Sequence, residues 1–123
     1  MKTLNLSTHT RIILISKLSG LNNLNLQSLN HILKVIERVS IKEDEAKRVN
    51  LREEKDEATG NILTRWDRVN EESGEELDVP VDIELSDDQA KTLEKILEDM
   101  GEKESLSIQD RPLLEVYEQL RKL

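Results

Sequence analysis

Apolar residues recur every three or four positions over several stretches of the chain, which is the spacing of one face of an α-helix. The predicted helices cover residues 7–18, 26–39, 41–49 and 87–101, and a last one begins near residue 110. The first four helices begin with a capping signal: Ser7, Asn25, and two capping boxes that begin at Ser40 and Ser86. Glycines are placed to end the helices at residues 20 and 101. The run Ile12–Ile15 also fits a buried strand, but the cap, the length and the glycine favour a helix.

The two C-terminal helices have well-defined apolar faces. The helix at 87–101 is expected to bury Ala90, Leu93, Ile96, Leu97 and Met100. The last helix is expected to bury Leu113, Leu114, Val116, Tyr117, Leu120 and Leu123.

Strict alternation of apolar and polar residues over 77–85 predicts a half-buried strand with an acidic outer face. Pro80 has no amide hydrogen to donate, so this strand lies at an edge or pairs only beyond the proline. Residues 51–57 and 61–68 flank a turn at Gly60 and predict a hairpin. Residues 3–6 also alternate, and they fit either a short strand or an extended arm.

Together these elements predict an α+β fold in which N-terminal and C-terminal helices cover one face of a three-stranded antiparallel meander. At 123 residues the chain is expected to form a single domain. Within it, 1–49 would be a helical unit, 50–85 the β-meander, and 86–123 two closing helices. No internal repeat is evident in the sequence.

Negative charge is concentrated in one stretch of the chain. Between Glu71 and Glu104 there are fourteen carboxylates against three lysines, and the net charge of the whole chain is −8. The carboxylates that would form an exposed face are Asp82, Glu84, Asp87, Asp88, Glu94 and Glu98. Such a face either imitates the phosphates of DNA and fills a basic groove on a nucleic-acid-handling protein, or is an ordinary solvated surface. Interrupting lysines such as Lys91 and Lys95 favour the solvated surface.

A second candidate for partner binding is the cluster Arg65, Trp66 and Arg68, because Trp and Arg are enriched in binding hot spots. The alternative is that Trp66 lies in the core and packs the sheet against the helices. The absence of phenylalanine from the chain favours the core position for its single tryptophan.

Signals of catalysis are weak, and we expect no enzymatic activity, no catalytic residues and no cofactor. His9 and His31 have no nucleophile or metal-ligand spacing around them. Asp82 and Glu84 share a strand face that could hold magnesium, but a site requires more oxygen ligands, so no metal is expected. The acidic balance also argues against direct nucleic-acid binding.

The chain has no cysteine, and its longest apolar run is too short for a signal peptide or a membrane span. A cytoplasmic protein without a membrane partner is therefore expected.

In its order of elements, with Arg65-Trp66-Asp67 ending the hairpin and Leu85-Ser86-Asp87-Asp88-Gln89 opening a helix, the chain resembles small uncharacterised proteins of bacteriophages and prophages. The resemblance implies a host-directed or virion-accessory role that acts by binding. The resulting hypothesis is a non-enzymatic interaction protein whose partner is another protein. The alternative is an acidic inhibitor of a DNA- or RNA-handling protein that acts through the 71–104 face, and a homo-oligomer is left open.

Overall fold

A computed structural model describes residues 1–22, 24–103 and 106–122 of the chain. The contacts divide the chain into two compact units: Met1–Ser40 together with Pro80–Leu123 form the first unit, and Ile41–Val79 form the second. The second unit is thus a continuous insertion into the first.

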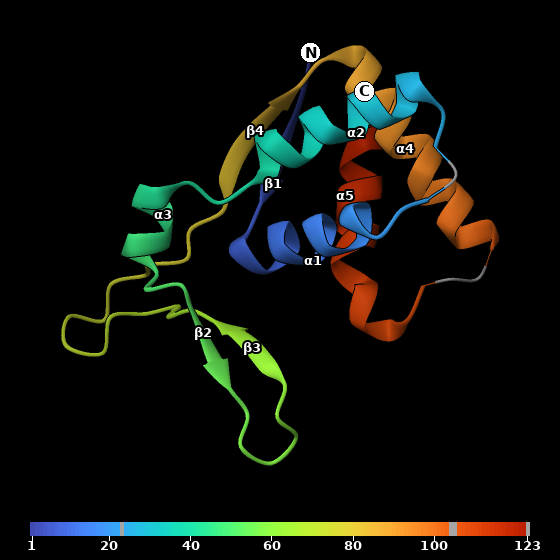
Figure 1. The fold of residues 1–123 in the computed structure, drawn as a ribbon. Coiled ribbons are helices and arrows are strands. Elements are labelled where there is room, and N and C mark those ends of the chain that lie inside the picture. The colour runs from blue at the N-terminus through green and yellow to red at the C-terminus, as the bar shows by residue number, and fades with distance from the viewer. Residues whose placement is uncertain (23, 104–105, 123) are drawn as a thin grey trace. The chain divides into compact units, whose positions relative to one another are not determined.

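The first unit is built from two short strands and several helices (Figure 1). Its elements are β1 (Lys2–Leu6), α1 (Thr8–Ser19), α2 (Leu26–Val39), β4 (Val81–Leu85), α4 (Asp87–Glu102), the 3-10 helix η1 (Ile108–Asp110) and α5 (Arg111–Arg121). Strands β1 and β4 form an antiparallel two-stranded sheet. Helix α1 contacts α2, α2 contacts α4, α4 contacts α5 and α5 contacts α1, so these helices form a closed ring of neighbours.

The α+β class is therefore confirmed, but the predicted three-stranded meander is wrong. Strand β4 pairs with β1, where Leu4 lies opposite Ile83, and the hairpin of the second unit forms its own two-stranded sheet. The reason is the pattern of apolar residues: β1 and β4 each bury alternate residues, whereas β3 (Ile62–Arg65), the neighbour of β4 in the predicted meander, reads Ile-Leu-Thr-Arg and is exposed throughout. Pairing begins at Val81, just beyond Pro80, as the proline requires.

The core of the first unit lies between the inner face of this sheet and the helices. Leu4 and Leu85 are fully buried there, and all the residues predicted for the inner face of α4 are buried. The last helix differs from the prediction, because Leu114 is 57% exposed and Tyr117 is only partly buried. Leu123 lies outside the described residues.

The first unit consists of two β-α-α halves related by an internal two-fold arrangement, which the sequence did not reveal as a repeat. Each half has a strand, a serine N-cap and two helices. Ser7 lies between β1 and α1, with α2 next in the chain, and Ser86 lies between β4 and α4, with α5 as the second helix. The buried residues correspond in order, so that Leu14 and Leu18 of α1 match Leu93 and Leu97 of α4. In the second helices the buried sets are Ile32, Val35 and Val39 of α2 and Leu113, Val116 and Leu120 of α5.

The outer edge of β1 is covered by a side chain of α5. The amide of Gln119 accepts a hydrogen bond from the Asn5 backbone N–H at 2.7 Å and donates one to the Asn5 carbonyl at 3.0 Å. Gln119 thus satisfies backbone groups of β1 that, at an open sheet edge, could pair with a strand of another chain.

A buried arginine joins α1 to the end of α2. Arg11 is 3% exposed, its Nε donates to the carbonyl of Val39 at 2.9 Å, and its Nη2 donates to the carbonyl of Ser40 at 2.7 Å. These carbonyls lie at the negative end of the helix dipole, where a cation is favoured.

The second unit contains α3 (Glu43–Arg48) and a hairpin of β2 (Arg52–Lys55) and β3 (Ile62–Arg65). The predicted turn is confirmed: Gly60 adopts a φ of 76°, and Asp56 accepts hydrogen bonds from Ala58 and Thr59. A second tight turn follows, in which Gly74 has a φ of 73°.

Two residues predicted to begin or end a helix, Ser40 and Gly101, have other roles in the structure. The hydroxyl of Ser40 donates to the carbonyl of Ile36 at the end of α2, and the capping contact of α3 is instead that of the Lys42 N–H with Glu45. Gly101 lies within the last turn of α4, which runs on to Glu102.

Candidate functional site

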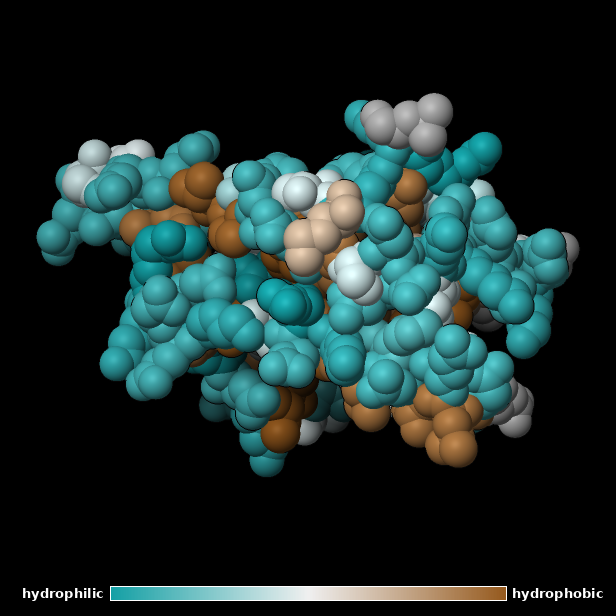
Figure 2. Space-filling model, turned by 90° about the horizontal axis from the view of Figure 1, so that it is seen from above, coloured by the Kyte–Doolittle hydropathy of each residue, from teal (hydrophilic) through white to brown (hydrophobic). Residues whose placement is uncertain are grey.

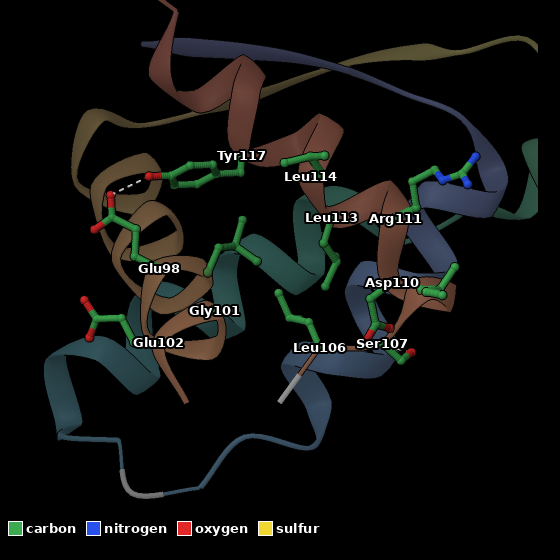
Figure 3. Close-up of a pocket in the computed structure, with 12 residues that line it drawn as sticks. Glu98, Gly101, Glu102, Leu106, Ser107, Asp110, Arg111, Leu113, Leu114 and Tyr117 are labelled. Carbon is green, nitrogen blue, oxygen red and sulfur yellow. Dashed lines mark hydrogen bonds between the residues drawn. The ribbon is translucent and has the colours of Figure 1, made fainter. Parts of the chain in front are cut away.

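An apolar groove lies between α4 and α5 in the first unit, and we name it the α4–α5 groove (Figure 3). It has a volume of about 1000 Å³. Leu97 and Leu113, which are buried, form its base, and η1 closes one end. The connection from α4 to α5, which contains η1, is longer than the connection from α1 to α2.

Large apolar side chains line the groove and remain in contact with solvent. Leu106 is 41% exposed, Ile108 86% and Leu114 57%. Gly101 adds open space, because a Cβ atom at this position would meet nothing within 4 Å. Figure 2 shows that apolar side chains reach the surface in separate groups surrounded by hydrophilic residues.

One long edge of the groove is acidic. Glu98 and Glu102 lie on the α4 side, opposite Arg111 (Figure 3). The hydroxyl of Tyr117 donates a hydrogen bond of 2.8 Å to Glu98. This bond, and to a lesser extent burial, raises the pKa of the tyrosine above its ordinary value. The guanidinium of Arg121 lies 5.5 Å from the centre of the Tyr117 ring. The aromatic ring is therefore held between a carboxylate and a cation at the rim of the groove.

An ion pair fixes the end of the groove to α1. Asp110 is 7% exposed, and its carboxylate lies 2.9 Å from the Lys17 ammonium. It also accepts a hydrogen bond of 2.9 Å from the backbone N–H of Ser107. The bond from Ser107 and the pairing with Lys17 hold the pKa of Asp110 below its ordinary value.

We expect Asp110→Asn to lower the free energy of unfolding at neutral pH by about 1 kcal/mol, because asparagine still accepts from Ser107 but loses the pair with Lys17. The folded pKa of Asp110 is lowered, so its contribution is present above the unfolded value and is lost as the pH falls through the folded value. Urea unfolding between pH 7 and pH 3 should therefore show the two proteins converging in acid. A difference that stays constant over this range would contradict the assignment.

The structure divides the acidic stretch between the two units. Its residues up to Val79 belong to the second unit and those from Pro80 onward to the first, and Glu104 lies outside the described residues. Asp82 and Glu84 are exposed on the outer face of β4, where Asp82 accepts a hydrogen bond of 2.9 Å from the Asn5 side chain. Asp87 and Asp88 are exposed in the first turn of α4.

The carboxylates of α4 face two different neighbours. Glu94 and Glu98 lie near Tyr117 of α5, since both influence its pKa. Asp88 and Asp99 line a separate polar cleft beside α2, together with the interrupting lysines and His31, which forms a hydrogen bond of 2.8 Å with Thr92. Only part of the predicted acidic face therefore borders the apolar groove.

The outer face of the β1–β4 sheet offers little attraction to nucleic acid. A two-stranded ribbon has the width to enter a DNA major groove. Among the described residues of β1 and β4, however, this face carries Thr3, Asn5, Asp82 and Glu84, with two carboxylates and no cation. Such a face would meet the phosphates with like charge.

The predicted cluster of Arg65, Trp66 and Arg68 belongs to the second unit. Trp66 is half-buried, and its indole Nε1 donates a hydrogen bond of 3.0 Å to Asp78. It is only half-buried and does not belong to the hydrophobic core cluster, so the expectation of a core position for Trp66 is wrong. Together with Arg68 and Leu77 it lines a hollow of about 690 Å³.

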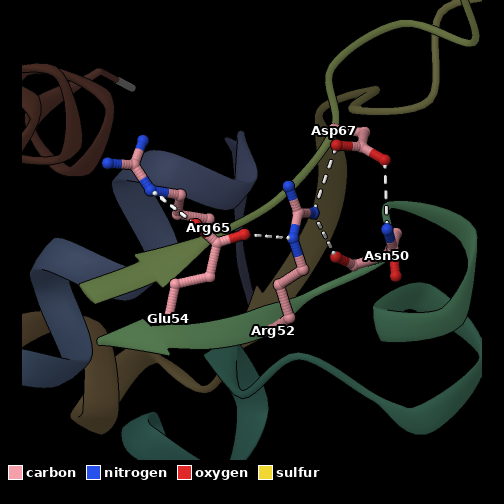
Figure 4. A network of polar contacts seen from close by, with 5 residues as sticks. All are labelled: Asn50, Arg52, Glu54, Arg65 and Asp67. Atoms are coloured by element: carbon pink, nitrogen blue, oxygen red, sulfur yellow. Dashed lines mark hydrogen bonds and ion pairs between the residues drawn. The ribbon is translucent and has the colours of Figure 1, made fainter. Parts of the chain in front are cut away.

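Arg65 takes part in a network of polar contacts on the hairpin (Figure 4). Its Nε lies 3.2 Å from Glu54, which also accepts from Arg52 at 2.9 Å, and Arg52 reaches Asp67 at 3.2 Å. The hydrogen bonds to Glu54 and Asp67 raise the pKa of Arg52. All these side chains are partly exposed, so each pair contributes little to stability, but together they restrict the conformation of Arg65.

Clusters of metal-ligating side chains are not found in the part of the chain that the structure describes. Within it, no group of three or more His, Asp or Glu side chains converges as metal ligands would. The two carboxylates on β4, Asp82 and Glu84, lie on the outward face of the sheet beside Asn5 and Thr3.

Sequence reasoning missed most residues of the groove. Leu114 was assigned to the core because it follows Leu113, although it lies off the stripe formed by Leu113, Val116 and Leu120. Leu106 and Ile108 lie in a short connection without periodicity, so the signal that could have found them is the presence of large apolar residues in a polar segment.

None of the helices in the described ranges is both long and apolar enough to cross a membrane. Comparison of the chain with models of protein families, with curated proteins and with solved structures finds no match.

Proposed function

We propose that this chain is a small acidic interaction protein that acts by docking onto another protein rather than by catalysis, and that the α4–α5 groove is its docking site. The observation that carries the proposal is the set of solvent-exposed apolar side chains Leu106, Ile108 and Leu114 around one groove. Contiguous apolar surface rimmed by polar residues is typical of protein interaction sites. Aromatic residues such as Tyr117 are enriched at the centres of such interfaces.

The internal two-fold arrangement supplies a matched control for this proposal. Leu33 of α2 occupies the position that Leu114 occupies in α5, and each is 57% exposed. A glutamate at either position therefore has a similar cost in folding and the same change in charge, but only Leu114 lies in the groove. Unfolding curves should be alike for the two variants.

We expect wild type and Leu33→Glu to capture the same partner from a bacterial lysate, and Leu114→Glu to lose it. An interface residue of this kind contributes about 2 kcal/mol or more, so capture at low partner concentration should fall at least about tenfold. Equal capture by both variants would contradict the assignment of the groove.

The alternative is an acidic inhibitor that imitates nucleic acid, and a third variant separates the two. It carries Asp82→Asn, Glu84→Gln, Glu94→Gln and Glu98→Gln. The alternative would be favoured by a nucleic-acid-handling partner that binds Leu114→Glu but does not bind the four-site variant. High salt should also release such a partner.

A further inference from the structure

We infer that the α4–α5 groove binds an amphipathic α-helix of its partner, and that this helix carries lysine or arginine along one flank of its apolar stripe. The inference rests on the proposed function, since it specifies the partner of the same groove. The bound helix would place its apolar side chains over Leu97 and Leu113 and against the exposed Leu106 and Leu114. An amphipathic helix in an apolar groove is a recurrent mode of recognition.

The walls of the groove favour a helical occupant. Its sides are two helices, and α5 has 11 residues, which corresponds to about 16 Å of helix. A partner segment of about three turns has the same length. Gly101 leaves room on the α4 side at a position where a helix would be more stable with alanine.

The charge of the partner follows from a row of carboxylates on α4. Glu94, Glu98 and Glu102 are four positions apart, so they form one row along the helix, and Glu98 and Glu102 line the groove. Successive members are separated by about 6 Å along the axis. Basic residues spaced four apart on the bound helix repeat at the same distance and can face this row.

A second copy of this chain is a poorer occupant. The net charge of −8 makes two copies repel one another. The exposed side of α2, which includes Leu26, Leu29 and Leu33, carries the cations Lys34 and Arg38 as well as Glu37, so a second copy is disfavoured by its net charge alone.

The test uses three synthetic peptides of about 14 residues with one shared leucine stripe and flanks of lysine, glutamine or glutamate, each labelled for fluorescence anisotropy. We expect the lysine peptide to bind at least about tenfold more tightly than the glutamate peptide, with the glutamine peptide between them. The difference should shrink in about 0.5 M salt, because the carboxylates are near the surface and are screened.

Two variants with the same change in charge locate the effect. Glu98→Gln with Glu102→Gln should weaken the lysine peptide about fivefold, and Asp88→Asn with Asp99→Asn, on the side of α4 beside α2, should leave it within about twofold. Leu114→Glu should weaken the glutamine peptide, which has no charged flank, whereas Leu33→Glu should not. Circular dichroism confirms that all variants are folded.

Each contrary outcome has a separate meaning. Equal binding of the lysine and glutamate peptides, still dependent on Leu114, would overturn the basic helix and leave the groove as a docking site. Lysine-peptide binding that is sensitive to Asp88 and Asp99 instead of Glu98 and Glu102 would overturn the location. A concentration-dependent dimer that Leu114→Glu dissociates would assign the groove to a second copy and overturn the inference.

Discussion

Replacing Arg11 by methionine is expected to lower the free energy of unfolding by about 3 kcal/mol, because a buried carbonyl at the end of α2 loses its charged donor. Methionine fills a similar length but donates no hydrogen bond. The carbonyls of Val39 and Ser40 would then lie at the negative end of the helix without this cation. Urea unfolding followed by circular dichroism measures the loss.

Arg11→Lys is the matched control. The ammonium keeps the charge and can donate to one carbonyl, so we expect about half of the loss. A loss below about 0.5 kcal/mol for Arg11→Met would be typical of a surface position and would contradict the capping role.

Leu14→Ala and Leu93→Ala are expected to destabilise the protein by similar amounts, about 3 kcal/mol each. Both side chains are 0% exposed, and they occupy equivalent positions in the two β-α-α halves. Each truncation therefore leaves a cavity in the same position relative to the sheet and to the second helix of its half. Urea unfolding of both variants at one pH makes the comparison.

Leu114→Ala serves as the reference for a leucine outside the core, and its cost should stay below about 0.5 kcal/mol. Costs for Leu14 and Leu93 that differ by more than about 2 kcal/mol would show that the two halves are not packed alike.

Much of the helical structure could be predicted because its signals are local. The N-caps Ser7, Asn25 and Ser86 and the periodic apolar residues of α4 act within one or two turns. The partner of β4 could not be predicted in this way. Residues 77–85 show that a strand exists, but the choice between β1 and β3 depends on which distant segment offers a matching apolar face.

The internal two-fold arrangement was hidden for a related reason. The halves share the type and order of their buried positions, but Leu, Ile and Val exchange freely at such positions. The position of a polar residue such as Arg11 is also difficult to predict from local sequence. A charged residue is expected at the surface, and only the tertiary fold places Arg11 against the last carbonyls of α2.

The candidate site was predicted only in part. Glu94 and Glu98 were identified from charge, whereas the apolar lining was not, because Leu114 was grouped with the buried residues of its helix and Leu106 and Ile108 lie in a segment without periodicity. Trp66 was assigned to the core from its residue type, but the insertion in which it lies provides Asp78 as a partner for the indole and only partial burial.

The pairing of β1 with β4 has a consequence for the order of events during synthesis and folding. Asn5 and its partner Asp82 are 77 positions apart, and the whole second unit is translated between them. Contacts of such long range form slowly, because the closure of the loop costs entropy before the contacts stabilise it. Until β4 has been synthesised, the apolar face of β1 lacks the strand that pairs with it in the folded protein. Translation speed across the insertion, and chaperones that shield Leu4 and Leu6 meanwhile, should govern the yield of folded protein.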